Sequence, residues 1–451
     1  MMITPIMRAM ILVKGKIDTV FVLAIATVFM QIPSFYGEDI VNARNNYLTG
    51  NRTDFWGGVS TLIYAHIPNF GFRWQIWLAI FQITLTAFGL KSLITIRQQN
   101  RKIYLMNCLL AYSALVFGSQ MTRDGLMFSL LLFGFARLKR ITTKDSSTRA
   151  VILPLIVICI AMSFRPWLSI AVIPIVLFLL RNSKIKMTKT VLLLLLISIS
   201  VTPVLFELAS AKSLGLKKSY PEQQVMLMDT AATYCYTTNY LTGLKARKAL
   251  EIFTSNPIYP KMACQLYRPD TWLSLTQSRN ASSEGVEVNF ALIPTGDYIN
   301  YQSLKSKWIN LIISDPVTYL QNKMLFANKL LIGSDSRNIS LLSAKTNSTK
   351  LLGFFRLPFD IAISLHAYSF LAFFVILLLL PLKRYFRDRS IGLALDQLTI
   401  ALFTATVLWI SLSSVAYIGS NGRYTYALTL LSLVIYSSQL TSKSASEEKN
   451  G

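Results

Sequence analysis

The sequence predicts an all-α polytopic membrane protein with about ten transmembrane helices. Of its 451 residues, 53% are hydrophobic and only 15% are charged, whereas soluble domains carry roughly 25% charged residues. The mean hydropathy is +0.46. The basic residues gather in short links between long apolar runs, as the positive-inside rule requires of cytoplasmic loops. The prediction includes a large, mostly helical extracytoplasmic loop between the seventh and eighth helices.

The net charge of +24 does not indicate a nucleic-acid-binding protein. Proteins that bind single-stranded nucleic acid combine a basic groove with aromatic side chains for base stacking. Here the basic residues lie in the links between apolar runs, and no such basic and aromatic patch occurs. We therefore expect membrane lipids as partners and no nucleic acid.

Ten apolar runs can cross a bilayer, the shorter ones with help from flanking Arg and Lys side chains that reach the interface. The predicted spans are Ile17–Tyr36, Trp74–Ile96, Ile103–Phe117, Leu126–Phe135, Val151–Ser163, Trp167–Leu180, Val191–Ala209, Ile361–Leu382, Leu398–Tyr417 and Tyr424–Leu440. The first run has no small-residue cleavage site after it and is expected to be a retained anchor. Basic residues on alternate links place both termini in the cytoplasm.

This topology divides the chain into four parts. Residues 1–209 form an N-terminal region of about seven spans, whose first outer loop is 37–73. Residues 210–356 form an extracytoplasmic loop or domain, 357–440 a C-terminal region of about three spans, and 441–451 a disordered tail. Cys235 and Cys264 both fall in the extracytoplasmic part, where they form either a disulfide or two free thiols.

Glu38 and Asp39 open the first outer loop, where the outer leaflet meets water. A carboxylate here could act as a general base on an acceptor or bind a divalent cation such as Mg or Mn. The alternative is an ordinary solvated start of a loop. His66 lies later in the same loop and is a candidate substrate-binding residue; the alternative is a structural role, which is common for a lone loop histidine. No Cys/His cluster has the spacing of a metal site.

Three arginines occupy three short outer links of the predicted topology: Arg123, Arg165 and Arg423. Arg123 is followed by Asp124, so one alternative is a local ion pair that closes the hairpin. For Arg165 and Arg423, the alternative is anchoring at lipid headgroups. An anionic substrate would account for all three together, because the planar guanidinium suits phosphate oxygens.

The sequence contains no P-loop and no other nucleotide-binding or hydrolase motif. Any group transfer must therefore draw its energy from the substrate itself. An activated lipid phosphate fits that requirement.

Several short motifs resemble those of the multipass GT-C glycosyltransferases, bacterial branch. They are the acidic opening of the first outer loop at Gly37-Glu-Asp39, the hairpin Thr122-Arg-Asp-Gly-Leu-Met-Phe128, and Trp308 followed by Asp315-Pro-Val-Thr-Tyr319 in the large loop. Two details depart from the family pattern. The family's frequent aspartate pair is Glu-Asp here, and its His-Pro is His66-Ile-Pro68.

The resemblance implies a polyprenyl-phosphate-linked sugar as donor and an active site on the extracytoplasmic face. Asp39 would be the catalytic base, with Glu38 as the neighbouring option, and Arg123 and Asp124 would lie near the donor phosphate. We therefore expect a glycosyltransferase in the bacterial cytoplasmic (inner) membrane. A polysaccharide polymerase of the O-antigen or capsule type and a lipid-linked glycan transporter are the alternatives.

Overall fold

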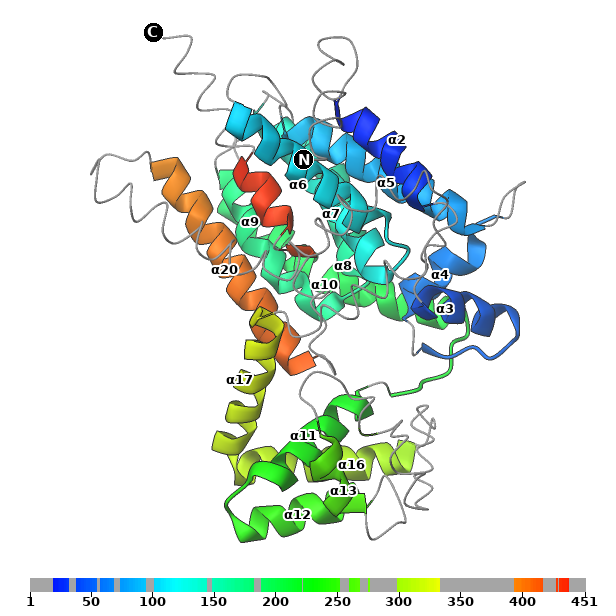
Figure 1. The fold of residues 1–451 in the computed structure, drawn as a ribbon, viewed down its shortest axis with the longest axis vertical. Coiled ribbons are helices and arrows are strands. Elements are labelled where there is room, and N and C mark those ends of the chain that lie inside the picture. The colour runs from blue at the N-terminus through cyan, green and yellow to red at the C-terminus, as the bar shows by residue number, and fades with distance from the viewer. Residues whose placement is uncertain are drawn as a thin grey trace, which may run out of the picture.

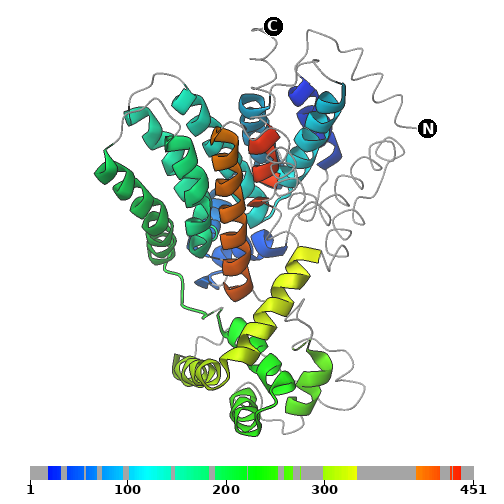
Figure 2. The ribbon, with the colours of Figure 1, turned by 90° about the vertical axis from the view of Figure 1, so that its left-hand side faces the viewer.

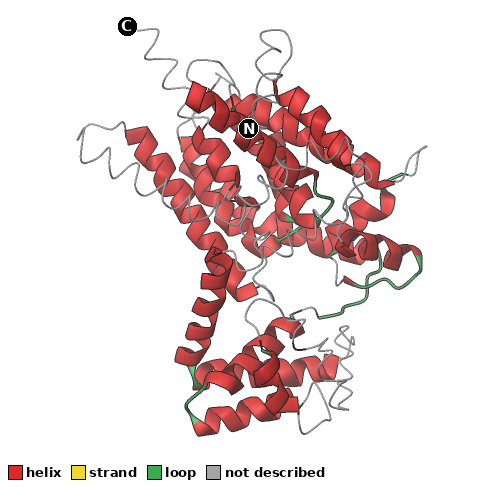
Figure 3. Ribbon diagram, viewed as in Figure 1, coloured by secondary structure: helices red, strands yellow, loops and turns green. Residues whose placement is uncertain are grey.

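The computed structural model describes residues 19–31, 38–54, 57–68, 74–94, 101–143, 148–181, 188–220, 222–251, 259–267, 275, 298–332, 393–416, 427–428 and 430–437. Within these residues the secondary structure is helical and no β-strand occurs (Figure 3). A single isolated bridge joins Thr53 to Lys217. The predicted all-α fold is confirmed.

Eight helices form a bundle in which each overlaps a predicted apolar run (Figure 1). They are α2 (Thr19–Gln31), α5 (Trp74–Leu93), α6 (Arg101–Ser119), α7 (Arg123–Thr143), α8 (Ile152–Met162), α9 (Ser169–Arg181), α10 (Lys189–Ser213) and α20 (Leu393–Ala416). Helix α7 packs against α5 and α8, and α9 packs against α20. Apolar side chains such as Leu131, Phe135 and Ile158 are fully buried between them.

In the described part of the chain, three helical segments are long and apolar enough to cross a membrane: Trp74–Leu93, Lys189–Ser213 and Gln397–Val415. Shorter apolar helices cover Asn107–Ser119, Arg149–Met162 and Pro166–Arg181. These features are those of a membrane protein. The predicted span at 361–382, Arg423 and the tail at 441–451 lie outside the described residues.

Two short helices follow the first span and pack on each other at one end of the bundle: α3 (Glu38–Leu48) and α4 (Gly58–His66). Arg44 of α3 is buried and donates hydrogen bonds to the carbonyls of Tyr64 and, at 3.0 Å, Ile67. Its guanidinium also lies 5.0 Å from the ring centroid of Trp74. Arg44 thus satisfies carbonyls at the C-terminal end of α4, which lack partners within the helix, and ties α3 to α4 and α5.

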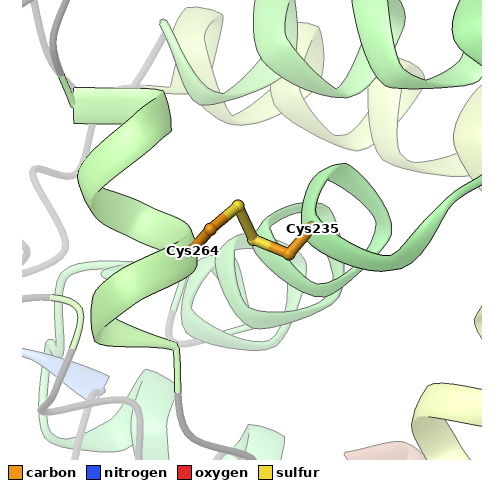
Figure 4. Close-up of a disulfide and its surroundings, with 2 residues drawn as sticks. All are labelled: Cys235 and Cys264. Atoms are coloured by element: carbon orange, nitrogen blue, oxygen red, sulfur yellow. A yellow bond between two sulfur atoms is a disulfide. The ribbon is translucent and has the colours of Figure 1, made fainter.

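A separate helical unit follows α10 and lies at one end of the molecule (Figures 1 and 2). It consists of α11 (Gln223–Tyr236), α12 (Tyr240–Leu250), α13 (Tyr259–Leu266), α16 (Tyr298–Ser314) and α17 (Pro316–Ile332). Its core includes Leu227, Leu250 and Ala263. A disulfide joins Cys235 of α11 to Cys264 of α13 (Figure 4). Helix α17 leads from this unit to α20, against which it packs.

A buried polar cluster fixes α17 and α16 on α11. Lys323 of α17 forms an ion pair with Asp229 of α11 at 2.7 Å. The indole Nε1 of Trp308 donates to the other carboxylate oxygen of Asp229 at 3.1 Å. Pairing and hydrogen bonding compensate the cost of burying the charges. The structure therefore gives Trp308, one of the residues in the resemblance, a structural role.

Asp315 begins α17 by capping its N-terminus. Its carboxylate accepts a hydrogen bond from the Thr318 amide at 3.1 Å and another from the Thr237 hydroxyl at 2.7 Å. The Thr237 hydrogen bond lowers the pKa of Asp315, although partial burial opposes it. Pro316 at the first helical position needs no hydrogen-bond partner for its nitrogen. The Asp-Pro-x-Thr sequence thus encodes the junction between α16 and α17.

We expect Asp315→Asn to remove a contribution to the free energy of unfolding that is present near neutral pH and lost in acid. Because the pKa is lower in the folded chain, the unfolded chain binds more protons as pH falls. The stabilisation is therefore complete above the usual carboxyl range and is lost as pH falls through the folded pKa. Asn still caps a helix, so the loss near neutral pH should be only about 0.3–1 kcal/mol. Thermal unfolding midpoints of both proteins in detergent should converge on acidification, and a difference independent of pH would contradict the assignment.

Candidate functional site

The turn between α6 and α7 is shaped by the hairpin motif Thr122-Arg-Asp-Gly125. The Thr122 hydroxyl accepts a hydrogen bond from the Gly125 amide at 3.0 Å and so caps α7. A Cβ atom on Gly125 would lie 2.1 Å from the carbonyl oxygen of Gln120. Only glycine permits this approach of backbone to backbone. Thr122 and Gly125 therefore build the turn that presents Arg123 and Asp124.

Buried polar side chains hold this turn against α5. The amide of Gln82 donates to the Gln120 carbonyl at 3.1 Å, and the hydroxyls of Thr86 and Ser129 are hydrogen-bonded at 3.0 Å. All four residues are buried. Interhelical hydrogen bonds of this kind favour one arrangement of helices in an apolar bundle. These buried hydrogen bonds therefore fix the position of the α6–α7 turn inside the bundle.

Asp124 forms a buried ion pair with Arg165, which lies in the turn before the short 3₁₀ helix η3 (Pro166–Leu168). The Arg165 Nε and Nη2 atoms donate to the two Asp124 oxygens at 3.2 and 3.4 Å. Only 6% of the Arg165 side chain and 3% of the Asp124 side chain are exposed. This bidentate pair joins the α6–α7 turn to the α8–α9 turn. In this conformation Arg165 positions the turn and does not face solvent.

Adjacent residues of a helix point in different directions, so Arg123 does not follow Asp124 toward Arg165. Arg123 is half-buried and interacts electrostatically with Glu207 of α10. Asp124 is thus bonded to Arg165 in another turn, and Arg123 interacts with Glu207. The local Arg123–Asp124 pair that closes the hairpin stays a prediction.

Glu207 is the functional candidate that the sequence analysis missed. It lies near the end of the long apolar helix α10, and its carboxylate accepts hydrogen bonds from the first two amides of α4, Gly58 and, at 3.0 Å, Val59. The N-terminal amides and dipole of a helix favour such a carboxylate. The available signal was a single acid inside an apolar run, which is a functional candidate by default.

Asp54 connects the segment between α3 and α4 to the residues after α10. Its Oδ1 atom accepts hydrogen bonds from the amide and the hydroxyl of Ser219, at 2.7 and 2.6 Å. Next to it, Thr53 and Lys217 form the isolated bridge. Asp54 also interacts electrostatically with Glu207. The segment between α3 and α4 is therefore tied at two points to the residues that follow α10.

Glu38 and Asp39 are the first two residues of α3, which packs on α4, and α4 in turn packs on α10. Their helix thus belongs to the same assembly as Glu207 and Arg123. His66 lies at the opposite end of α4, is exposed, and its Nδ1 is 2.7 Å from the Leu62 carbonyl of its own helix. That contact supports the structural alternative for His66. Arg423 lies outside the described residues.

The candidate site therefore consists of Arg123 and Asp124 on α7, Glu207 on α10 and Arg165 in the α8–α9 turn, with the first amides of α4 bound to Glu207. Arg165 and Asp124 form an ion pair, and Arg123 interacts electrostatically with Glu207. Such an arrangement can hold a guanidinium and a carboxylate in fixed positions near a polar surface. Among the described residues, no group of three or more His, Cys, Asp or Glu side chains could hold a metal ion; a divalent cation remains a prediction.

No protein-family model, curated protein or solved structure matches the chain significantly. Functional inference therefore depends on the site itself and on the short motifs in the sequence.

Proposed function

We propose that this chain is a membrane glycosyltransferase of the GT-C type. It would move a sugar from a polyprenyl-phosphate donor to a lipid, glycan or protein acceptor on the extracytoplasmic face of a bacterial inner membrane. The observation that carries the proposal is the charged assembly around Arg123, Asp124 and Glu207 at one end of an apolar helical bundle. Charged groups in apolar surroundings are costly and are usually retained for function.

The proposed topology has ten spans, both termini in the cytoplasm, and the helical unit outside. The disulfide between Cys235 and Cys264 supports this orientation, because disulfides persist in oxidising compartments and are rare in the cytosol. The three long apolar helices and the shorter ones beside them supply most of the proposed spans. The same orientation puts α3 and α4 on the outer side, together with the helical unit.

In the proposed reaction, Asp39 takes the proton from an acceptor hydroxyl, and Glu38 is the neighbouring alternative. The acceptor oxygen forms a bond to the anomeric carbon of the sugar. The bond from that carbon to the phosphate oxygen breaks, and polyprenyl phosphate leaves with the electron pair. Arg123 stabilises the negative charge on this leaving phosphate, with Arg423 as a second contact. The Asp124–Arg165 pair positions Arg123. A divalent cation, Mg or Mn, could assist at the phosphate.

The test uses full-length protein in proteoliposomes, short-chain polyprenyl-phosphate sugars as donors, and lipid and glycan extracts of a bacterial envelope as acceptors. Release of polyprenyl phosphate is measured. We expect Asp39→Asn to lower the rate by roughly 10²–10⁴-fold, the usual contribution of a general base. Glu251→Gln, a carboxylate change on the surface of the helical unit, is the matched control and should leave the rate unchanged.

Full activity in the Asp39→Asn, Glu38→Gln double variant would overturn the catalytic assignment. A polysaccharide polymerase would give a different pattern, since it would depend on arginine more than on a carboxylate. In that case Arg123→Ala would abolish the reaction while Asp39→Asn would not. A transporter would move the lipid-linked glycan across the bilayer without releasing polyprenyl phosphate.

A further inference from the structure

The helical unit carries a basic surface along the seam between α12 and α16. Lys245 of α12 donates to the hydroxyl of Ser314 on α16 at 3.1 Å. One turn further along α12, Lys307 of α16 donates to the Lys248 carbonyl at 3.5 Å. The two helices therefore run antiparallel, with Lys245, Lys248 and Lys307 beside each other. We refer to these three lysines as the seam lysines.

Among the described acids of the helical unit, Asp229 and Glu251 are paired with cations, whereas Glu222 and Asp315 accept hydrogen bonds from hydroxyl groups and keep their negative charge. Glu222 accepts from the Tyr301 hydroxyl at 3.1 Å, and Asp229 pairs with Lys323 at 2.7 Å. Asp315 accepts from Thr237, and Glu251 pairs with Arg247 at 3.4 Å. Asp315, which follows Ser314, offsets only one of the three charges of the seam lysines. The seam thus presents a local excess of positive charge, which attracts anions over about a Debye length.

Exposed apolar side chains border the seam at the corner where α11 meets α12 and α16 meets α17. Tyr240, Leu241 and Ile313 are 76%, 67% and 72% exposed. The Thr237–Asp315 hydrogen bond holds these two junctions together. A tyrosine ring combines an apolar face with a polar hydroxyl, which suits contact with the ring of a sugar. Basic and aromatic groups therefore lie next to each other.

The location of the seam limits the kinds of partner that can contact it. Helix α12 lies at the end of the molecule farthest from the apolar bundle in both views (Figures 1 and 2). This position, away from the apolar bundle, favours a partner in solution over membrane headgroups. We infer that the seam lysines and Tyr240 bind an acidic polysaccharide chain. That this chain is the acceptor rests on the proposed function, whereas the binding itself does not.

The test is binding to full-length protein in nanodiscs of uncharged lipid, measured by biolayer interferometry. The probes are polygalacturonate, dextran of similar length as a neutral glycan, and polyglutamate as an acidic peptide. We expect polygalacturonate to bind more tightly than either other probe. The triple variant Lys245→Gln, Lys248→Gln, Lys307→Gln should weaken this binding about tenfold, because each exposed charge contributes a modest amount. The affinity of the triple variant for polygalacturonate should also depend less on salt concentration.

Two control variants separate the seam from general electrostatics. Lys212→Gln, Lys217→Gln, Lys218→Gln removes the same charge from exposed positions in the last turn of α10 and in the connection after it, and should change affinity less than twofold. Tyr240→Ala should weaken polygalacturonate binding but leave polyglutamate binding unchanged. Equal loss in both triple variants, absence of polygalacturonate binding, or tighter binding of polyglutamate would overturn the inference. Binding without sugar transfer would leave it standing while the proposed function failed.

Discussion

Removing either partner of the Asp124–Arg165 ion pair is expected to lower the free energy of unfolding by about 3–5 kcal/mol, because the remaining charge stays buried without its counterion. Both side chains are almost inaccessible, at 6% and 3% exposed. The variants are Asp124→Asn and Arg165→Met. Unfolding of the full chain in mixed detergent micelles, followed by circular dichroism, measures the change.

The chain contains a suitable control pair. Arg247 and Glu251 form an ion pair at 3.4 Å, but their side chains are 49% and 47% exposed. Arg247→Met and Glu251→Gln should each cost less than about 1 kcal/mol. In a double-mutant cycle, Asp124→Asn with Arg165→Met should cost less than the sum of the single changes. Simple additivity would show that the two residues are not coupled.

Gly58→Ala is expected to lower the free energy of unfolding by about 2–4 kcal/mol, from overpacking and from weakened hydrogen bonds to Glu207. A Cβ atom at this position would lie 2.5 Å from the amide nitrogen of Ala211 and 2.6 Å from the carbonyl oxygen of Glu207. Both are backbone atoms of α10, so a side-chain movement cannot relieve the clash. Helix α4 would have to move away from α10.

Gly243→Ala is the matched control and should have the opposite sign. Gly243 lies inside α12, and a Cβ atom there would meet only a Thr237 methyl group at 3.6 Å. Alanine should therefore stabilise the helix by up to about 1 kcal/mol. Glu207→Leu should cost about 1.5–3 kcal/mol, and its combination with Gly58→Ala should cost less than the sum. Equal effects of Gly58→Ala and Gly243→Ala would contradict the described contact.

The helices could be predicted from the sequence because apolar runs between basic links carry a strong signal. The run at 191–209 and the run at 74–96 correspond closely to α10 and α5. The disulfide could only be proposed as one of two alternatives, since cysteine spacing does not determine pairing. The short helices α11 to α13 were not individually predictable, because their apolar positions are few and their packing against each other decides their limits.

The candidate site was predictable by residue type but not by pairing. Arg165 meets Asp124 across 41 residues of sequence, and no local pattern predicts which turn reaches which. The sequence does not single out Glu207, because averaging the hydropathy over the apolar run hides one acidic residue. Arg44, which ties α3 to α4 through backbone carbonyls, has no sequence signature, because its acceptors are carbonyl groups that every residue carries.

The contact between Asp54 and Ser219 has a consequence for the order of biosynthesis. The two residues are 165 positions apart, and at roughly 5–20 residues per second the ribosome needs about 8–33 s to make the intervening chain. During that interval Asp54 lacks its partner Ser219, and the start of α4 lacks its partner Glu207 for almost as long. The partners Cys235 and Cys264, separated by only 29 positions, emerge shortly afterwards. The Asp54–Ser219 contact and the disulfide therefore become possible in quick succession near the middle of the 451-residue chain. The interval before them is the period when an insertase or chaperone has the most to protect.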